Sequence, residues 1–179
     1  MIVKIRDRKK TKFTRMCIGE AMILLMKSKK YYELKVSEIV KRAGVSRMSF
    51  YRYYQTPYDA LKDYLEIIVE EYLQESRAIQ ERTTWFEYQH ILFSLNFFDR
   101  YRGYFLTMAQ NGLHSILLDG VNSVMMDAFQ TSDLLSRYEM YSYAGGLMNS
   151  FLKWEEGGKV ERAEDVAGVI YRLYHAKEE

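Results

Sequence analysis

Three histidines, one cysteine and scattered glutamates are the side chains of this sequence that could bind a metal ion or catalyse a reaction. Glu87 and His90 have the spacing that places a carboxylate and an imidazole on one face of a helix. A carboxylate-bridged metal site in a helical bundle needs two such pairs, and the sequence has no second pair. A metal at His90 with ligands from other helices is one reading, and an ordinary hydrogen bond to Glu87 is the other. We expect the ordinary hydrogen bond, and therefore neither a metal ion nor a cofactor.

Other catalytic patterns are also missing. The sequence contains no His-Glu-x-x-His motif, no glycine-rich phosphate loop and no nucleophile elbow. Cys17 falls within an apolar stripe at helical spacing, which predicts a small buried side chain rather than a redox sensor. We therefore expect a protein that is not an enzyme.

Charge is distributed unevenly along the chain. Residues 1–55 contain 15 Lys and Arg and 4 Asp and Glu, a net charge of +11, whereas residues 56–179 contain 11 and 20, a net charge of −9. This asymmetry suggests a basic module that binds a polyanion, followed by an acidic module with another task. A basic segment that merely aids solubility is the alternative.

The composition favours helices in a cytoplasmic protein. The 179 residues are 48% hydrophobic and include ten glycines and one proline, too few for a fold rich in turns. No apolar run approaches the ~18 residues of a membrane span, and the basic N-terminus lacks the apolar core of a signal peptide. The single cysteine excludes an intramolecular disulfide.

Apolar residues at helical spacing predict an all-α fold of about nine helices. Ser46, Thr56, Thr84 and Ser132 are predicted to cap helix starts. The first segment owes its apolar stripe to residues such as Phe13, Cys17 and Leu24. The predicted helices are 7–29, 37–43, 47–53, 57–76, 85–98, 100–110, 114–129, 133–154 and 162–175.

Residues 36–54 have the pattern of a helix-turn-helix. Two short helices are joined by a turn in which Gly44 can adopt a left-handed conformation, and the second helix can enter a DNA major groove. Phe50 and Tyr54 are expected to pack inward, whereas the residues at the start of the second helix project outward.

This stretch resembles the TetR family of transcriptional regulators, and the resemblance extends over residues 7–65. The residues that match the family pattern are Val36, Ile39, Gly44, Val45, Ser46, Phe50, Tyr51, Tyr53 and Tyr54. Lys30, Lys35 and Pro57 depart from it, and Pro57 replaces a lysine expected to contact phosphate. The resemblance implies a DNA-binding domain at residues 1–56 and a ligand-sensing, dimerising domain at residues 57–179.

The resemblance also assigns roles in DNA binding. Arg47 would donate a bidentate pair to a guanine edge, with Met48 and Ser49 contacting neighbouring base edges beside the cap residue Ser46. A solvated surface charge is the alternative for Arg47. The basic arm at residues 4–12 could add affinity or be a simple tail. The residues expected to hold phosphates are Lys35, Ser37, Tyr51, Tyr53 and Thr56.

The acidic half is richer in aromatic residues and methionine than an ordinary core requires, which together with the resemblance favours a pocket for a small apolar or aromatic effector. A plain hydrophobic core is the alternative. The candidate ligand-binding residues are His90, Phe93, Phe97, Met108, His114, Met125 and Phe129.

The predicted helix 133–154 carries two apolar stripes, one through Tyr138 and Met148 and another through Leu147 and Phe151. One monomer's core accounts for only one stripe, so we expect a homodimer through helices 133–154 and 162–175. We interpret the chain as a repressor that binds a pseudo-palindromic operator and is released by the effector. The alternative is a protein-interaction adaptor of the same fold that senses no small molecule or has lost specific DNA binding.

Overall fold

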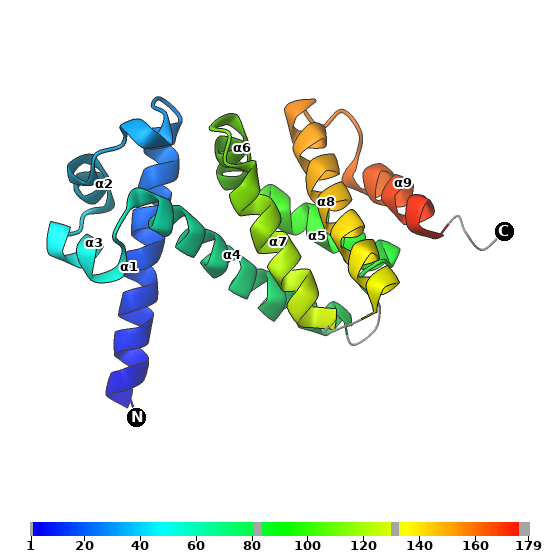
Figure 1. Ribbon diagram of the computed structural model, residues 1–179, viewed down its shortest axis with the longest axis horizontal. Helices are drawn as coiled ribbons and strands as arrows, with labels where there is room; N and C mark the ends of the chain where they lie inside the picture. Colours follow the sequence, from blue (N-terminus) through cyan, green and yellow to red (C-terminus); the bar gives the residue numbers. More distant parts are fainter. Residues whose placement is uncertain (1, 81–83, 130–132, 176–179) are drawn as a thin grey trace. The chain divides into compact units, whose positions relative to one another are not determined.

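The computed structural model describes the backbone of residues 2–80, 84–129 and 133–175, and their side chains except those of residues 2–10, 78, 80 and 127–129. These residues form nine α-helices and a short 3-10 helix, with no strand among them. Figure 1 labels the α-helices in chain order. The predicted all-α class is therefore confirmed. None of the helices in the described ranges is both long and apolar enough to cross a membrane.

The chain divides into two compact units, and the division falls inside one helix. The first unit extends to Ile68 and includes Gln110–Gly112, and the second contains Val69–Ala109 and the chain from Leu113 onward. The helix α4 (Pro57–Gln80) therefore belongs to both units. The domain boundary expected at residue 56 lies just before α4 begins, whereas the first compact unit extends into that helix.

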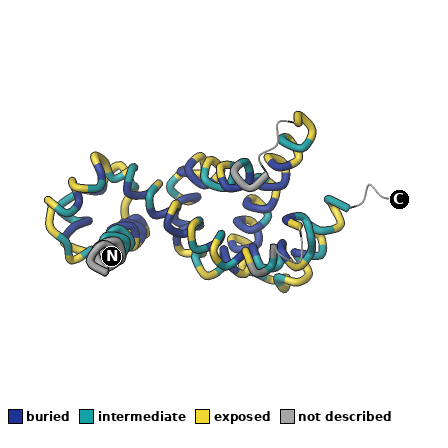
Figure 2. The backbone as a smooth tube through the Cα atoms, turned by 90° about the horizontal axis from the view of Figure 1, so that it is seen from below, coloured by how far each residue is buried: buried dark blue, intermediate teal, exposed yellow. Residues whose placement is uncertain are grey.

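The first unit is a small helical domain built on a long helix. It contains α1 (Ile2–Met26), the 3-10 helix η1 (Tyr31–Glu33), α2 (Val36–Ala43), α3 (Arg47–Tyr53) and the first half of α4. Figure 2 shows the buried faces of these helices turned toward one another. The fully buried side chains that form this core are Ile18, Met22, Ile39, Phe50 and Leu61.

Close contact between α1 and α4 depends on a glycine. A Cβ atom at Gly19 would lie 2.7 Å from Cβ of Tyr64 and closer still to its ring. Any larger residue at position 19 would push Tyr64 away, and Tyr64 is buried, 7% exposed, with little room to move. Gly19 therefore allows α4 to approach α1 at this crossing.

The second unit is a bundle formed by the rest of α4 and five further helices. These are α5 (Tyr88–Arg100), α6 (Arg102–Gln110), α7 (His114–Phe129), α8 (Leu134–Glu156) and α9 (Ala163–His175). In Figure 1, α7 runs beside α8, and the contacts also place α9 against α5. Its core is aromatic and aliphatic, with Ile91, Leu95, Phe105, Tyr143 and Phe151 fully buried.

Several predicted boundaries hold and others are wrong. Helix α3 has the predicted bounds, Ser46 accepts a hydrogen bond from the Ser49 N–H, and Gly44 has a left-handed φ of 67°. Helix α5 begins at Tyr88 rather than at residue 85, because a turn from Trp85 precedes it. Asp133 caps α8 by accepting from the Ser136 N–H, whereas the predicted cap Ser132 lies outside the described residues.

The apolar stripe of the first helix was also overestimated. Phe13 is 68% exposed and Leu24 is 44% exposed, so neither belongs to the core. Other apolar residues of the same helix, such as Ile18 and Met22, are fully buried. The core face of α1 is consequently narrower than the sequence predicts.

Candidate nucleic-acid interface

The exposed face of α3 has the side chains that a recognition helix needs. Arg47 is exposed, Met48 is 78% exposed and Tyr51 is 59% exposed. Phe50 and Tyr54 face the other way and are buried, as predicted. At 100° per residue, one side of this short helix is therefore anchored in the core while the other is available to a ligand.

The two serines at the start of α3 contact each other. Ser46 Oγ accepts from the Ser49 N–H at 3.0 Å, and the two hydroxyl oxygens are 3.0 Å apart. The Ser49 hydroxyl is half-buried and already has this partner. Arg47 and Met48 are thus better placed than Ser49 to contact the edge of a base.

The residues predicted to hold phosphates lie mainly at helix ends. Lys35 is exposed and precedes α2, where its backbone N–H donates to Glu38 Oε2, and Ser37 is half-buried in the first turn. Thr56 is exposed and caps α4, accepting from the Asp59 N–H at 3.3 Å. Helix N-termini attract anions because their backbone N–H groups are unpaired.

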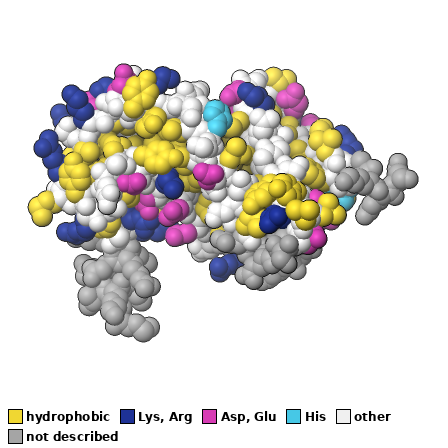
Figure 3. Space-filling view, in the orientation of Figure 1, with side chains coloured by type: hydrophobic (Ala, Val, Ile, Leu, Met, Phe, Trp, Pro, Cys, Tyr) yellow, Lys and Arg dark blue, Asp and Glu magenta, His cyan; other side chains and the backbone are white. Residues whose placement is uncertain are grey.

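Cations gather around these helix ends. Figure 3 shows Lys and Arg side chains over α2 and α3 at the edge of the first unit. Tyr53, the remaining phosphate candidate, is half-buried beside exposed Arg52. In the basic arm at residues 4–12, the side chains of residues 4–10 lie outside the described residues, so the role of the arm stays a prediction.

Behind α3, one carboxylate joins three helical elements. Asp63 of α4 accepts two hydrogen bonds from the guanidinium of Arg15 in α1, with Nε at 2.8 Å from Oδ2. The hydroxyl of Tyr54, the residue that ends α3, donates to the same Oδ2 at 2.5 Å. Burial and the hydrogen bond to Asp63 raise the pKa of Tyr54, so its hydroxyl keeps the proton that it donates.

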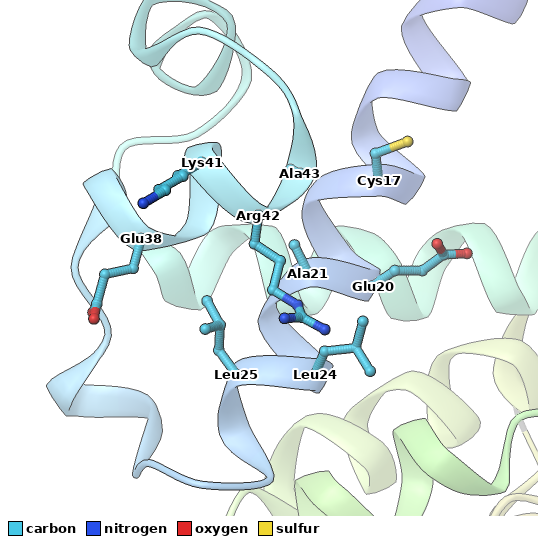
Figure 4. Close-up of a pocket in the computed structure, with 9 residues that line it drawn as sticks. All are labelled: Cys17, Glu20, Ala21, Leu24, Leu25, Glu38, Lys41, Arg42 and Ala43. Atoms are coloured by element: carbon cyan, nitrogen blue, oxygen red, sulfur yellow. The ribbon is translucent and has the colours of Figure 1, made fainter.

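An open groove of about 630 Å³ lies between α1 and α2 and was not predicted. Figure 4 shows Arg42 extending from α2 toward Leu24 of α1, whereas Lys41 points away. Cys17 lines the groove and is half-buried, so the prediction of a buried cysteine is only partly met. Burial and the nearby Glu20 carboxylate raise the pKa of the Cys17 thiol, which favours its protonated form.

In the second unit, His90 is buried among aromatic rings. Its ring lies 4.4 Å from Trp85, 6.1 Å from Tyr72 and 6.0 Å from Phe93, measured between ring centroids. Its side chain is fully buried, and its Nε2 has no hydrogen-bond partner among the residues that the structure describes. Burial lowers the pKa of His90 to about 4, because the charged imidazolium would lose its water. The predicted hydrogen bond between Glu87 and His90 side chains is therefore wrong.

The other nitrogen of His90 lies beside Ser94. The Ser94 hydroxyl donates to the His90 carbonyl oxygen at 2.8 Å, and it lies 2.8 Å from the Tyr72 hydroxyl and 3.5 Å from His90 Nδ1. A hydroxyl has one hydrogen, so with the Ser94 proton on the His90 carbonyl oxygen, Tyr72 donates to Ser94 Oγ. With the imidazole proton on Nδ1, which faces Ser94 Oγ, Nε2 would be an acceptor without a partner among the described residues.

The predicted ligand-binding residues are only partly brought together. Phe93 and Phe97 join the His90 cluster, with ring centroids 6.0 Å apart, and Met108 and Met125 are buried elsewhere in the core. His114 is exposed at the start of α7, and the side chain of Phe129 lies outside the described residues. Within the described part of the chain, no three His, Cys, Asp or Glu side chains are grouped as a metal site requires.

Helices α8 and α9 keep apolar residues at the surface. Met140, Tyr143, Leu147, Phe151 and Trp154, the whole of one predicted stripe of α8, are buried within the monomer. The other stripe is exposed at its beginning and buried at its end, where Met148 and Leu152 join the core. The exposed apolar residues of the two helices are Leu134, Leu135, Tyr138, Tyr141, Val169 and Leu173.

Comparison with known proteins gives results for both the first unit and the whole fold. Residues 21–56 match the family model of bacterial regulatory proteins, tetR family. The solved structure of the dihydroxyacetone kinase operon activator DhaS is similar, with a TM-score of 0.54, 20% sequence identity, and coverage of 92% of this chain and 95% of that one. That likeness concerns the fold. The search of curated proteins gave no match.

Proposed function

Because residues 21–56 match the family model of bacterial regulatory proteins, tetR family, we propose that this chain reads a specific operator with α3 and regulates transcription there. The observation that carries the proposal is the exposed pair Arg47 and Met48 on a helix whose opposite face is anchored by buried Phe50. Arg47 supplies the paired donors that suit guanine, and Met48 supplies an apolar surface for a thymine methyl.

Contacts to phosphate would fix the position of α3 on the duplex without reading its sequence. Five residues are proposed for this task. Lys35, Ser37 and Thr56 lie near helix N-termini, Tyr51 lies on the exposed side of α3, and Tyr53 is half-buried at the end of that helix. The departure at Pro57 removes one cation from this set.

Selection of duplexes from a random pool is the decisive experiment. We expect enrichment of a pseudo-palindrome whose half-site centres are ~34 Å apart, or a small multiple of that distance. Arg47→Ala should weaken binding by about 1–3 kcal/mol and relax preference at one base pair in each half-site, whereas Tyr51→Phe should weaken all duplexes alike. Equal affinity for enriched and scrambled duplexes would show that the chain does not read sequence.

Two copies of the chain are proposed to meet through α8 and α9. The exposed apolar residues of these helices would be covered in a bundle of four helices around a twofold axis, which also supplies two copies of α3 for two half-sites. Leu173→Glu, at a position that is 70% exposed, should produce a folded monomer with weakened operator binding. Sedimentation and duplex titration measure both. An unchanged dimer would place the interface elsewhere.

An effector is proposed to bind the second unit and release the protein from its operator, so that it acts as a repressor. The support for this role is His90 Nε2, which lies in an aromatic cluster without a hydrogen-bond partner among the described residues and is an acceptor when Nδ1 carries the proton. A buried acceptor without a partner is costly, and an aromatic ligand with a hydroxyl or N–H group would satisfy it.

The effector proposal is tested with pairs of ligands that differ in one donor. We expect phenols to change the fluorescence of Trp85 and to weaken operator binding, whereas their methyl ethers should do neither. Linkage requires the operator to weaken phenol binding by the same factor. A reporter gene under the enriched operator then distinguishes repression from activation. Equal responses to phenols and ethers would remove His90 from the proposed site.

A further inference from the structure

The contacts of Asp63 connect the far end of the recognition helix to the body of the first unit. Arg15 and Tyr54 both donate to its carboxylate, and the three residues come from α1, the end of α3 and α4. The Asp63 side chain is only 16% exposed, and Tyr54 is 5% exposed. Hydrogen bonds to an ionised group in such a place are short and about twice as strong as neutral ones.

The ring of Tyr54 does not need its hydroxyl in order to pack. It lies 5.4 Å from the ring of Phe50 in an edge-to-face contact and 6.1 Å from that of Tyr53. Its backbone N–H donates to the Phe50 carbonyl and closes the last turn of α3. The hydroxyl therefore contributes to the orientation of α3 rather than to hydrophobic burial, because its hydrogen bond joins the end of α3 to one oxygen of Asp63.

We propose that Asp63 is a positioning residue for DNA reading, holding α3 at the angle at which Arg47 and Met48 meet base edges. This inference rests on the proposed operator binding. Helix α3 is seven residues long, so Tyr54 and Arg47 are ~10 Å apart along the axis. A swing of ~10° at Tyr54 moves Arg47 by ~2 Å, far more than the few tenths of an ångström that a direct hydrogen bond tolerates.

Phosphate contacts by long side chains at the surface would survive such a swing, because they follow the charge of the backbone rather than the position of one base. Loss of the Asp63 contacts should thus lower specific binding more than nonspecific binding. A merely structural role would instead lower both in proportion to the folded fraction.

Tyr54→Phe is the principal test, because it removes the hydroxyl and keeps the ring. A duplex enriched by the wild-type protein and a scrambled duplex are titrated by fluorescence anisotropy at several salt concentrations, with thermal unfolding followed by circular dichroism. We expect the ratio of the two affinities to fall at least tenfold, with unchanged affinity and salt slope for the scrambled duplex. Tyr53→Phe, on the same helix, is the matched control and should weaken both duplexes alike.

Replacement of Arg15 supplies an independent test. Arg15→Lys retains a charged donor to Asp63 and should keep part of the specificity that Arg15→Met loses. Asp63→Asn should resemble Tyr54→Phe, and if it unfolds, Tyr54→Phe still decides the question. An unchanged affinity ratio in folded Tyr54→Phe overturns the positioning role. Failure of the wild-type protein to enrich any duplex overturns the operator proposal instead, so the two failures are distinguishable.

Discussion

Replacing His90 by leucine should remove a large part of the acid sensitivity of the fold. Burial lowers the pKa of this imidazole from 6.5 to about 4 in the folded protein. Between these two pH values the unfolded chain binds a proton that the folded protein does not, so the free energy of unfolding falls as pH decreases from 7 to 4. At about 1.4 kcal/mol for each pKa unit, the wild-type protein should lose about 3 kcal/mol through this one group.

Urea unfolding of the wild-type protein and His90→Leu at pH 7 and pH 4 measures the effect. Other acidic and basic groups contribute equally to both proteins, so the difference between their two pH-dependent losses isolates His90. His114→Leu, at an exposed position, is the control for replacing a histidine at the surface. The reasoning is refuted if the wild-type protein and His90→Leu lose the same free energy of unfolding between pH 7 and pH 4.

Three further substitutions test other contacts. Gly19→Ala should lower the free energy of unfolding by about 1–3 kcal/mol in urea titrations, because the new Cβ would overlap Tyr64. If the variant is as stable as the wild-type protein, α1 and α4 can move apart at no cost. Ser46→Ala should cost about 1 kcal/mol by removing the cap of α3, and the corresponding Ser46→Thr change should recover most of it. Lys159→Met removes the ammonium that lies 3.5 Å from the buried Glu155 carboxylate, whose pKa is raised by burial. The substitution should lower the free energy of unfolding more at pH 8, where Glu155 is ionised, than at pH 5. An equal loss at both pH values would contradict this account.

Local chemistry explains why the helix-turn-helix was predictable. Gly44 turns left-handed after α2 and Ser46 caps α3, and both signals act within a few residues of the boundary that they define. The 3-10 helix Tyr31–Glu33 was missed because its stabilising contacts are not periodic. Thr84 has the chemistry of a cap but does not start α5, since the chain first turns to bury Trp85.

Long-range packing explains what the sequence did not reveal about the sites. His90 and His114 have the same side chain, yet one is fully buried and the other exposed, which depends on how distant helices pack. Arg15 and Asp63 are 48 residues apart, and no local pattern pairs them. The exposure of Phe13 could not be predicted from the sequence for the same reason, because an apolar residue at helical spacing is buried only if another element covers it.

Because α4 is continuous through residue 68, the first unit should not be separable from the chain at residue 56. A fragment that ends there lacks Asp63, which binds Arg15, and Tyr64, which packs on α1 at Gly19. Such a fragment should be an unstable peptide despite containing every base-reading residue. The smallest autonomously folding DNA reader in this chain would therefore extend at least to Ile68, and limited proteolysis should cut beyond that residue rather than at the loop before Pro57.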